Sequence, residues 1–376
     1  MKYRRLGRTG VQVSALGFGT MRLPRGKTEA DVNEAESIEM IRFAIDQGVN
    51  YIDTAYVYHG GNSERIVGSA LEGDYRSRVH IATKLPVWMV NETRDCDRLL
   101  DEQLTRLRCG HIDFYLLHCL QKKSWEKMRD IGVLEWAEKA RSEGRIRHLG
   151  FSFHDDYDTF ERIVDEHDWS VCQIQYNYLC EEVQAGTRGL QYAASKDLGV
   201  IVMEPLFGGT LACPPRPAQE IWDSVLDRYR PVDLALQWLW NRPEVATVLS
   251  GMNELSQVQE NIASANRSGV GTLDTDAIEL IRRVRDAYMQ LSPIPCTKCG
   301  YCLPCPHGVN VPQNLELFNH ATVLKGNSAV LCKNLYFAMP ENERAAGCVE
   351  CGTCEDHCPQ HISIRQMLKE VDKTFR

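Results

Sequence analysis

The sequence lacks any apolar run of the roughly 20 residues needed to span a bilayer. Its first twenty residues, MKYRRLGRTGVQVSALGFGT, are partly basic but contain no apolar stretch of seven or more, so they do not indicate a secretory signal. The net charge is −8, with acids and bases interspersed, and the sequence therefore lacks the basic excess that nucleic acid or an anionic membrane attracts. We expect a cytoplasmic protein that binds neither nucleic acid nor a membrane.

The chain is also not a small disulfide-stapled scaffold, although it contains 15 cysteines. Its 376 residues are 43% hydrophobic and 25% charged, which is typical of a large globular core that needs no covalent cross-links. Eight cysteines fall into two short runs. The other seven are scattered, and we expect most of them to be buried as small apolar residues: Cys96, Cys109, Cys119, Cys172, Cys180, Cys213 and Cys332.

From residue 15 to about 266, short apolar runs alternate with longer amphipathic stretches. Eight of the runs predict strands, at 15–20, 51–55, 80–84, 113–118, 146–152, 171–176, 199–205 and 246–251. Helical patterns lie between them, for example at 34–48, 63–73, 95–109, 124–144 and 231–240. Eight β–α units in roughly 250 residues predict a (β/α)₈ barrel. The alternative is a doubly wound open sheet, but no G-x-G-x-x-G follows the first strand.

The composition changes after about residue 290. The segment LSPIP at 291–295 is a proline-broken linker, and the cysteine-rich part of the chain follows it. We therefore predict two domains, a barrel over 1–290 and a small iron–sulfur domain over 291–376.

In a (β/α)₈ barrel the active site lies at the C-terminal ends of the strands, so polar residues at those ends are candidates. They are Thr20, Asp53, Lys84, His118, Ser152, Gln173 and Glu204. Three of them, Asp53, Lys84 and His118, end the second, third and fourth strands, and we expect them to converge at one rim.

Asp53, Tyr58, Lys84 and His118 together indicate proton transfer to a carbonyl oxygen. Tyrosine holds its proton to about pH 10, and a neighbouring lysine cation lowers that pKa. An aspartate keeps a buried lysine charged, and a histidine can hydrogen-bond and orient the carbonyl. Each residue alone also has a structural interpretation: a helix cap, a pocket-lining tyrosine, a solvated rim lysine or a core histidine. The set at consecutive strand ends is harder to explain in that way.

At this point the sequence resembles the aldo-keto reductase family, over residues 1 to about 266. The shared motifs are YRRLGRTGVQVSALGFGT, YIDTAYVYHGGNSERIVGSALEG, IATK, DFYLLH, LGFS, QIQYN, EPLFGGTL and SQVQEN, in the family's order. The resemblance implies a (β/α)₈ barrel that reduces aldehydes and ketones with a nicotinamide cofactor. It also implies a catalytic tetrad of Asp53, Tyr58, Lys84 and His118, with Tyr58 as the general acid.

The same resemblance implies a set of cofactor-binding residues. Besides Asp53 they are Gly19, Thr20 and Met21 under the nicotinamide, Ser152 and Gln173 at the carboxamide, Met203 where many members stack a tyrosine, Pro205, Leu206 and Gly208 near the pyrophosphate, Gly251, Met252, Asn253 and Gln257 in the next loop, and Glu260 and Asn261 at the adenine. Phe153 replaces the asparagine often found beside the serine.

The segment SGMNELSQ at 250–257 contains no lysine or arginine, whereas members that choose NADPH carry basic residues there. A 2′-phosphate attracts such a cation. We therefore expect either NADP or NAD as cofactor, with weak discrimination or a preference for NADH.

The two cysteine runs have the spacing of iron–sulfur ligands. The second is Cys348-x₂-Cys351-x₂-Cys354-x₃-Cys358-Pro, a bacterial ferredoxin pattern in which the fourth cysteine ligates the other cluster. The first, Cys296-x₂-Cys299-x₂-Cys302-x₂-Cys305-Pro, is one residue shorter in its last gap. The crossing rule assigns Cys296, Cys299, Cys302 and Cys358 to one 4Fe–4S cluster, and Cys348, Cys351, Cys354 and Cys305 to the other.

Zinc and disulfides are the competing interpretations of these cysteines. A Cys₄ zinc site uses two C-x-x-C pairs and does not need a third cysteine in each run. The module resembles the dicluster ferredoxin domain, with a helical insert from about 311 to 345. Some prokaryotic aldo-keto reductases carry this appendage.

Iron–sulfur clusters transfer one electron at a time, whereas a nicotinamide enzyme transfers a hydride. Three roles for the clusters are consistent with this difference. In the first, the clusters exchange electrons with ferredoxin or another carrier through a flavin, for which no motif is visible. In the second, they reduce the substrate directly. In the third, they are structural. Our leading hypothesis is an NAD(P)H-dependent oxidoreductase that acts reversibly on a small carbonyl substrate. The alternative is an electron-transfer protein whose barrel serves as a docking platform, although such a platform needs no lysine beside Tyr58.

Overall fold

The computed structural model describes residues 1–26, 28, 30–291, 293–294, 296, 300, 302–323, 327–358 and 360–376. The chain divides into two compact units. The first comprises Met1–Leu206 and Val232–Asp274, and the second comprises Phe207–Pro231 and Thr275–Arg376. The segment before residue 232 and the helix before residue 291 thus group with the C-terminal part of the chain. The domain boundary near residue 290 stays a prediction.

Eight parallel strands close into a barrel in the order β10–β3–β4–β5–β6–β7–β8–β9. Their bounds are β3 Leu16–Gly19, β4 Tyr51–Asp53, β5 His80–Leu85, β6 Ile112–Leu120, β7 Ile146–Phe153, β8 Val171–Gln175, β9 Gly199–Met203 and β10 Val245–Gly251. Each strand coincides with one of the eight predicted apolar runs. The closed parallel sheet confirms the predicted (β/α)₈ barrel and rules out the open sheet.

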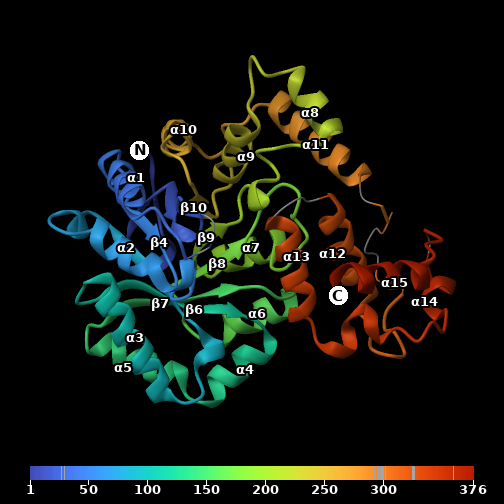
Figure 1. The fold of residues 1–376 in the computed structure, drawn as a ribbon, viewed down its shortest axis with the longest axis horizontal. Helices are drawn as coiled ribbons and strands as arrows, with labels where there is room; N and C mark the ends of the chain where they lie inside the picture. Colours follow the sequence, from blue (N-terminus) through green and yellow to red (C-terminus); the bar gives the residue numbers. More distant parts are fainter. Residues whose placement is uncertain are drawn as a thin grey trace. The chain divides into compact units, whose positions relative to one another are not determined.

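Helices surround these strands, as Figure 1 shows for α1 to α7. Their bounds are α1 Glu34–Asp46, α2 Asn62–Ala70, α3 Thr93–Leu107, α4 Lys122–Asp130, α5 Val133–Ser142, α6 Tyr157–Glu166, α7 Gly186–Ser195, α9 Pro231–Trp240 and α10 Leu255–Asn266. The predicted helical stretch 124–144 is two helices. It breaks because Gly132 adopts the left-handed conformation, with φ 80°, which glycine tolerates at no steric cost.

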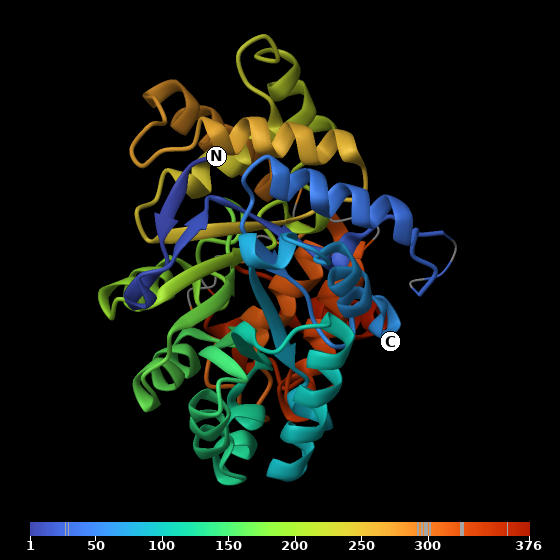
Figure 2. The same ribbon diagram turned by 90° about the vertical axis from the view of Figure 1, so that its left-hand side faces the viewer.

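A short antiparallel hairpin precedes the barrel and was not predicted. It pairs β1 (Tyr3–Arg5) with β2 (Gln12–Ser14) and is dark blue in Figure 2. Leu6 in its loop is fully buried and belongs to the apolar cluster inside the barrel. Because the loop meets the first residue of β9, the hairpin covers the end of the barrel opposite the strands' C-terminal ends.

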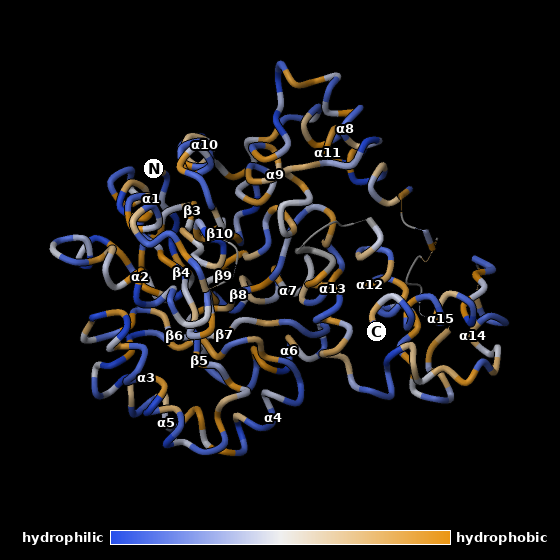
Figure 3. Tube along the Cα trace, viewed as in Figure 1, coloured by the Kyte–Doolittle hydropathy of each residue, from blue (hydrophilic) through white to orange (hydrophobic). Residues whose placement is uncertain are grey.

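The core of the first unit has two layers. One lies inside the barrel and includes Phe114, Val171 and Ile201; the other lies between strands and helices. Figure 3 shows the corresponding pattern, with hydrophobic residues frequent along the strands and hydrophilic residues on the outer loops. Because apolar side chains pack on both the inner and the outer face of the barrel sheet, the polar side chains gather at the ends of the strands.

The second unit contains α8 (Arg216–Asp223), α11 (Thr275–Gln290), α12 (Val311–Val323), α13 (Asn327–Ala338), the short α14 (Thr353–Asp356) and α15 (Ile364–Phe375). Helices α12 and α13 form the predicted insert between the cysteine runs, and α12 also packs on α15.

Two buried asparagines of α12 fix the chain just before each cysteine run. The Asn319 amide bonds the backbone of Ile294, at 3.0 Å to its nitrogen and 2.7 Å to its oxygen. The Asn314 amide donates to the carbonyl of Glu343 at 2.8 Å and accepts from the amide of Ala345 at 2.8 Å. Buried amides paired in this way hold a defined backbone position, so the insert organises both runs.

Within the described part of the chain, no helix has the combination of length and apolar character needed to cross a membrane.

Candidate active site

Four polar residues meet at the C-terminal end of the barrel. Asp53 is the last residue of β4, Lys84 lies near the end of β5, and His118 lies near the end of β6. Tyr58 begins the short 3₁₀ helix η3 (Tyr58–Gly61), which follows β4. Adjacent parallel strands end at the same rim, so residues far apart in sequence become neighbours here.

The Lys84 ammonium is at the centre of this group and is 1% exposed. It donates to both carboxylate oxygens of Asp53 at 2.8 Å and to the carbonyl of Thr54 at 2.7 Å. Its fourth partner is the Tyr58 hydroxyl at 3.3 Å. A buried cation with three close acceptors has little freedom, so it presents its charge to the tyrosine in one geometry.

Burial and charge act in opposite directions on this pair. Burial alone lowers the pKa of Lys84, but the Asp53 carboxylate and then Tyr58 raise it, and the net shift is upward. Burial raises the pKa of Tyr58 to about 12, and the Lys84 charge lowers it only in part. The expected lowering by lysine is therefore present but is outweighed by desolvation. At neutral pH Tyr58 is a protonated donor and Lys84 is a cation.

His118 is a neutral imidazole in this environment. Burial, the Lys84 charge and the His154 charge, in that order, lower its pKa well below the usual 6.5. Its ring meets the Tyr58 ring edge-on, with centroids 6.1 Å apart. The Nδ1 atom of His118 is buried and has no hydrogen-bond partner among the described residues. Such an atom is available to a ligand.

Two further residues border the tetrad and were not singled out from the sequence for this role. The Trp88 ring lies 5.1 Å from the His118 ring and is 50% exposed, so it forms an apolar wall open to solvent. Cys119, the residue after His118, has a positive φ of 56°, and burial raises the pKa of its thiol to about 11. In the sequence, these residues could have been found only by their positions: Trp88 lies just after β5, and Cys119 directly follows His118.

The predicted carboxamide-binding residues are neighbours. Ser152 of β7 and Gln173 of β8 are paired in register. The Ser152 hydroxyl accepts from the backbone of Cys119 at 2.8 Å, and the Gln173 amide donates to the Met203 sulfur at 3.5 Å. The Gln173 Oε1 atom is buried and, within the described residues, unpaired. An unpaired buried acceptor fits the amide hydrogens of a carboxamide.

The loop after β3 is built around Thr20. Its hydroxyl donates to the carbonyl of Asp53 at 2.9 Å and shares a hydrogen bond with Ser63 at 2.7 Å. Thr20 is fully buried, so its side chain ties β3 to β4, whereas Met21 is 43% exposed. Gly19 pairs with Gly251, and a side chain at Gly19 would approach the carbonyl of Ser250 to 3.3 Å.

The predicted adenine-side residues begin at the end of β10. Asn261 on α10 donates to the Ser250 hydroxyl at 3.0 Å, and the Gln257 amide oxygen accepts from the backbone of Asn253 at 3.0 Å. Gly251 and Glu260 are exposed. Met252 differs from the rest because it is 1% exposed and packs in the core between strands and helices. Its side chain is therefore a structural anchor for this loop.

The residues predicted near the pyrophosphate follow β9. Pro205 is buried and Leu206 is half-buried in the first unit. Gly208 lies in the second unit, in the 3₁₀ turn η6 (Phe207–Gly209), with φ 62°.

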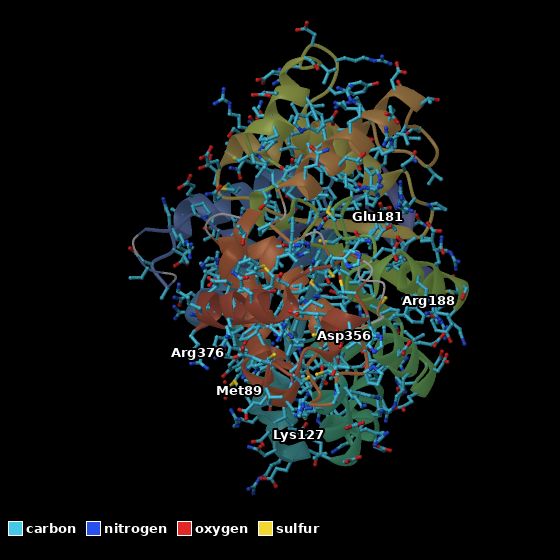
Figure 4. The ribbon with its side chains drawn as sticks, turned by 90° about the vertical axis from the view of Figure 1, so that its right-hand side faces the viewer. Met89, Lys127, Glu181, Arg188, Asp356 and Arg376 are labelled. Atoms are coloured by element: carbon cyan, nitrogen blue, oxygen red, sulfur yellow. The ribbon has the colours of Figure 1, made fainter. Side chains whose placement is uncertain are left out.

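One ion pair and one cation–π contact connect loops and helices of the first unit. Glu181, labelled in Figure 4, follows β8 and pairs with Arg242 at 2.9 Å. Arg188 on α7, also labelled there, lies over the Tyr157 ring with its guanidinium carbon 3.7 Å from the centroid.

Of the eight predicted iron ligands, Cys299 lies outside the described residues. Within the described part, no group of three or more histidine, cysteine or acidic side chains has the spacing of a metal site. Burial raises the pKa of Cys354 to about 11, with further upward contributions from Cys348, Glu355 and Cys302. The Cys348 sulfur accepts a hydrogen bond from the backbone of Glu350 at 3.4 Å.

A closed parallel barrel with this tetrad at its rim defines a class of nicotinamide-dependent oxidoreductases. The aldo/keto reductase family model matches residues 15–286, and the chain belongs to that family. A 4Fe-4S dicluster domain model matches residues 295–362. The protein is therefore an aldo/keto reductase-type enzyme with a C-terminal iron–sulfur module, as the motifs predicted.

Curated relatives include L-galactose dehydrogenase of Arabidopsis thaliana, 27% identical over 78% of this chain and 97% of the relative. NADH-specific methylglyoxal reductase of Escherichia coli is 26% identical over 76% of this chain and 99% of the relative. Among solved structures, aldo-keto reductase AKR11C1 from Bacillus halodurans in its holo form is 24% identical with a TM-score of 0.65, covering 76% and 96%. An aldo-keto reductase from Klebsiella pneumoniae in complex with NADPH is also 24% identical, with a TM-score of 0.62 and coverage of 76% and 95%. These structures share the fold.

Proposed function

We propose that the protein interconverts a small aldehyde or ketone and its alcohol, with NADPH or NADH as the two-electron partner and Tyr58 as the proton donor. The observation that carries the proposal is the Lys84 ammonium, which bonds both oxygens of Asp53 and reaches the Tyr58 hydroxyl at 3.3 Å. Two relatives, named as an L-galactose dehydrogenase and an NADH-specific methylglyoxal reductase, support both the substrate class and reversibility.

Each tetrad residue has a separate role in carbonyl reduction. Tyr58 donates its proton from Oη to the substrate's carbonyl oxygen as negative charge develops there. Lys84 stabilises the phenolate that remains, and Asp53 keeps Lys84 charged and fixed. Neutral His118 hydrogen-bonds the same carbonyl and orients it. Trp88 supplies an apolar wall that limits water at the reacting carbon.

The described residues fit a nicotinamide. Gln173 has an unpaired buried oxygen and lies beside Ser152, so these two would bind the carboxamide. When bound, the reduced cofactor supplies the hydride that converts the carbonyl carbon to an alcohol.

The test is anaerobic purification followed by titration with NADPH and NADH and by assays with a panel of aldehydes and ketones. We expect saturable binding of at least one cofactor and its substrate-dependent oxidation at 340 nm. An electron-transfer protein with a barrel used only for docking would instead show no carbonyl reduction, while its clusters would accept electrons from a reduced ferredoxin. That result would replace the proposed activity.

We further propose that the C-terminal module binds two 4Fe–4S clusters, one through Cys296, Cys299, Cys302 and Cys358 and the other through Cys305, Cys348, Cys351 and Cys354. The spacing of the two cysteine runs and the match of residues 295–362 to a 4Fe-4S dicluster domain model support this ligand set. The bound clusters would exchange electrons one at a time. Stoichiometric zinc without iron after anaerobic preparation would contradict the assignment.

A further inference from the structure

Arg22 lies close to the segment 250–257 in the structure, although the two are far apart in the sequence. It ends the 3₁₀ turn η2 (Thr20–Arg22), directly after β3. In the barrel β3 pairs with β10, and Gly19 lies opposite Gly251. A Cβ atom at Gly251 would come within 2.6 Å of Arg22 Cγ and 3.0 Å of Arg22 Cβ. The Arg22 side chain therefore lies against the first residues of the segment 250–257.

Residue 251 must be glycine because a larger side chain would collide with Arg22. Its backbone conformation does not itself require glycine. Gly251 is not among the residues with positive φ, so alanine could adopt its backbone conformation. The obstacle is steric, because the β- and γ-carbons of Arg22 are close to the main chain and cannot swing away freely. Arg22 thus fills the place that a side chain at 251 would occupy.

The guanidinium of Arg22 also has no anionic partner. It is half-buried, and it makes no hydrogen bond, ion pair or ring contact with any residue that the structure describes. Other half-buried arginines of the same unit bind carboxylates: Arg106 pairs with Glu64 at 3.3 Å and Arg145 with Asp97 at 2.8 Å. The planar guanidinium of a partly desolvated arginine without a carboxylate is suited to bond two oxygens of an oxyanion such as a phosphate group.

We propose that Arg22 binds a phosphate group of the nicotinamide dinucleotide, either the 2′-phosphate of NADPH or the pyrophosphate, and so replaces the basic residue that 250–257 lacks. This inference rests on the proposed function, because it assumes a dinucleotide at this rim. Within 250–257 no side chain carries a positive charge, because the segment has no lysine or arginine, and Met252 is buried in the core.

The test compares Arg22→Gln with Arg65→Gln in the full-length holoprotein. Arg65 is exposed on α2 and donates a hydrogen bond to the side chain of Asn62, so its replacement removes the same charge elsewhere on the first unit. Binding of NADPH, NADH and adenosine 2′,5′-bisphosphate is measured by fluorescence titration, after thermal melts show that both variants are folded. We expect Arg22→Gln to weaken phosphate-dependent binding about ten- to a hundredfold, the usual worth of a charge-assisted hydrogen bond, and Arg65→Gln to leave it unchanged.

The ligands distinguish the two phosphate sources. Loss of NADPH and bisphosphate affinity with NADH unchanged assigns Arg22 to the 2′-phosphate; an equal loss for NADPH and NADH assigns it to the pyrophosphate. Equal affinities of Arg22→Gln and wild type for all three ligands overturn the inference. If wild type itself binds neither dinucleotide, the proposed function fails, which is a separate result.

A second variant moves Arg22 without removing it. Gly251→Ala should displace the arginine side chain and weaken the same ligands, although the charge is retained. In the double variant the two losses should not add, because both act through the position of one guanidinium. Fully additive losses would mean that Gly251 contacts the cofactor independently of Arg22, and would overturn this part of the argument.

Discussion

Replacing Tyr58 by phenylalanine should abolish most carbonyl reduction while leaving the fold and the cofactor site intact. The Lys84 ammonium keeps its three shorter contacts, two to Asp53 at 2.8 Å and one to Thr54 at 2.7 Å, and loses only the 3.3 Å contact to the hydroxyl. A phenyl ring can retain the position 4.8 Å from the ammonium and the edge contact with His118. The melting temperature should therefore change little.

The activity change is much larger because the proton donor is removed. A general acid contributes about 10²–10⁴ in rate, equal to about 2.7–5.5 kcal/mol at 1.36 kcal/mol per factor of ten. The assay is kcat for the aldehyde that wild type reduces best, together with Kd for NADPH and NADH. A variant that retains more than about a tenth of wild-type kcat would refute the role of Tyr58.

Four further predictions follow from the same geometry and from the cysteine runs. Because burial raises the pKa of Tyr58 to about 12, the rate of carbonyl reduction should not fall through ionisation of Tyr58 between pH 6 and 9. The rate of alcohol oxidation, which needs the Tyr58 phenolate, should rise about tenfold per pH unit over the same range. A flat pH profile for oxidation would contradict this prediction. Lys84→Met leaves the Asp53 carboxylate buried and unpaired and should cost about 3–5 kcal/mol of unfolding free energy, and adding Asp53→Asn should restore much of it; no recovery in the double variant would argue against the ion pair. Wild type should contain about eight irons and Cys354→Ser about four, by iron analysis. Rapid mixing with reduced cofactor and substrate should leave the cluster absorbance unchanged, because in the proposed reaction the reduced cofactor supplies both electrons as a hydride and Tyr58 supplies the proton. Bleaching and recovery at the turnover rate would make the clusters redox participants.

The strands and the tetrad could be predicted because both depend on local patterns. Each barrel strand coincides with an apolar run, and the spacing from Asp53 to Tyr58 places a tyrosine just beyond a strand end. The N-terminal hairpin escaped prediction because its strands are only three residues long, at Tyr3–Arg5 and Gln12–Ser14. The helix break at Gly132 also escaped, since amphipathic periodicity continues through it and a single glycine is a weak signal.

By itself the sequence determined the barrel, the family and the eight candidate iron ligands, because strand periodicity and cysteine spacing are properties of short segments. Only the tertiary structure decided the sign of the pKa shift at Tyr58, since burial by distant residues competes there with the charge of Lys84. It likewise placed Met252 in the core and Arg22 against Gly251, 229 positions apart by their residue numbers. Closure of the barrel brings β3 beside β10, and this contact between opposite ends of the domain has no counterpart in the local sequence.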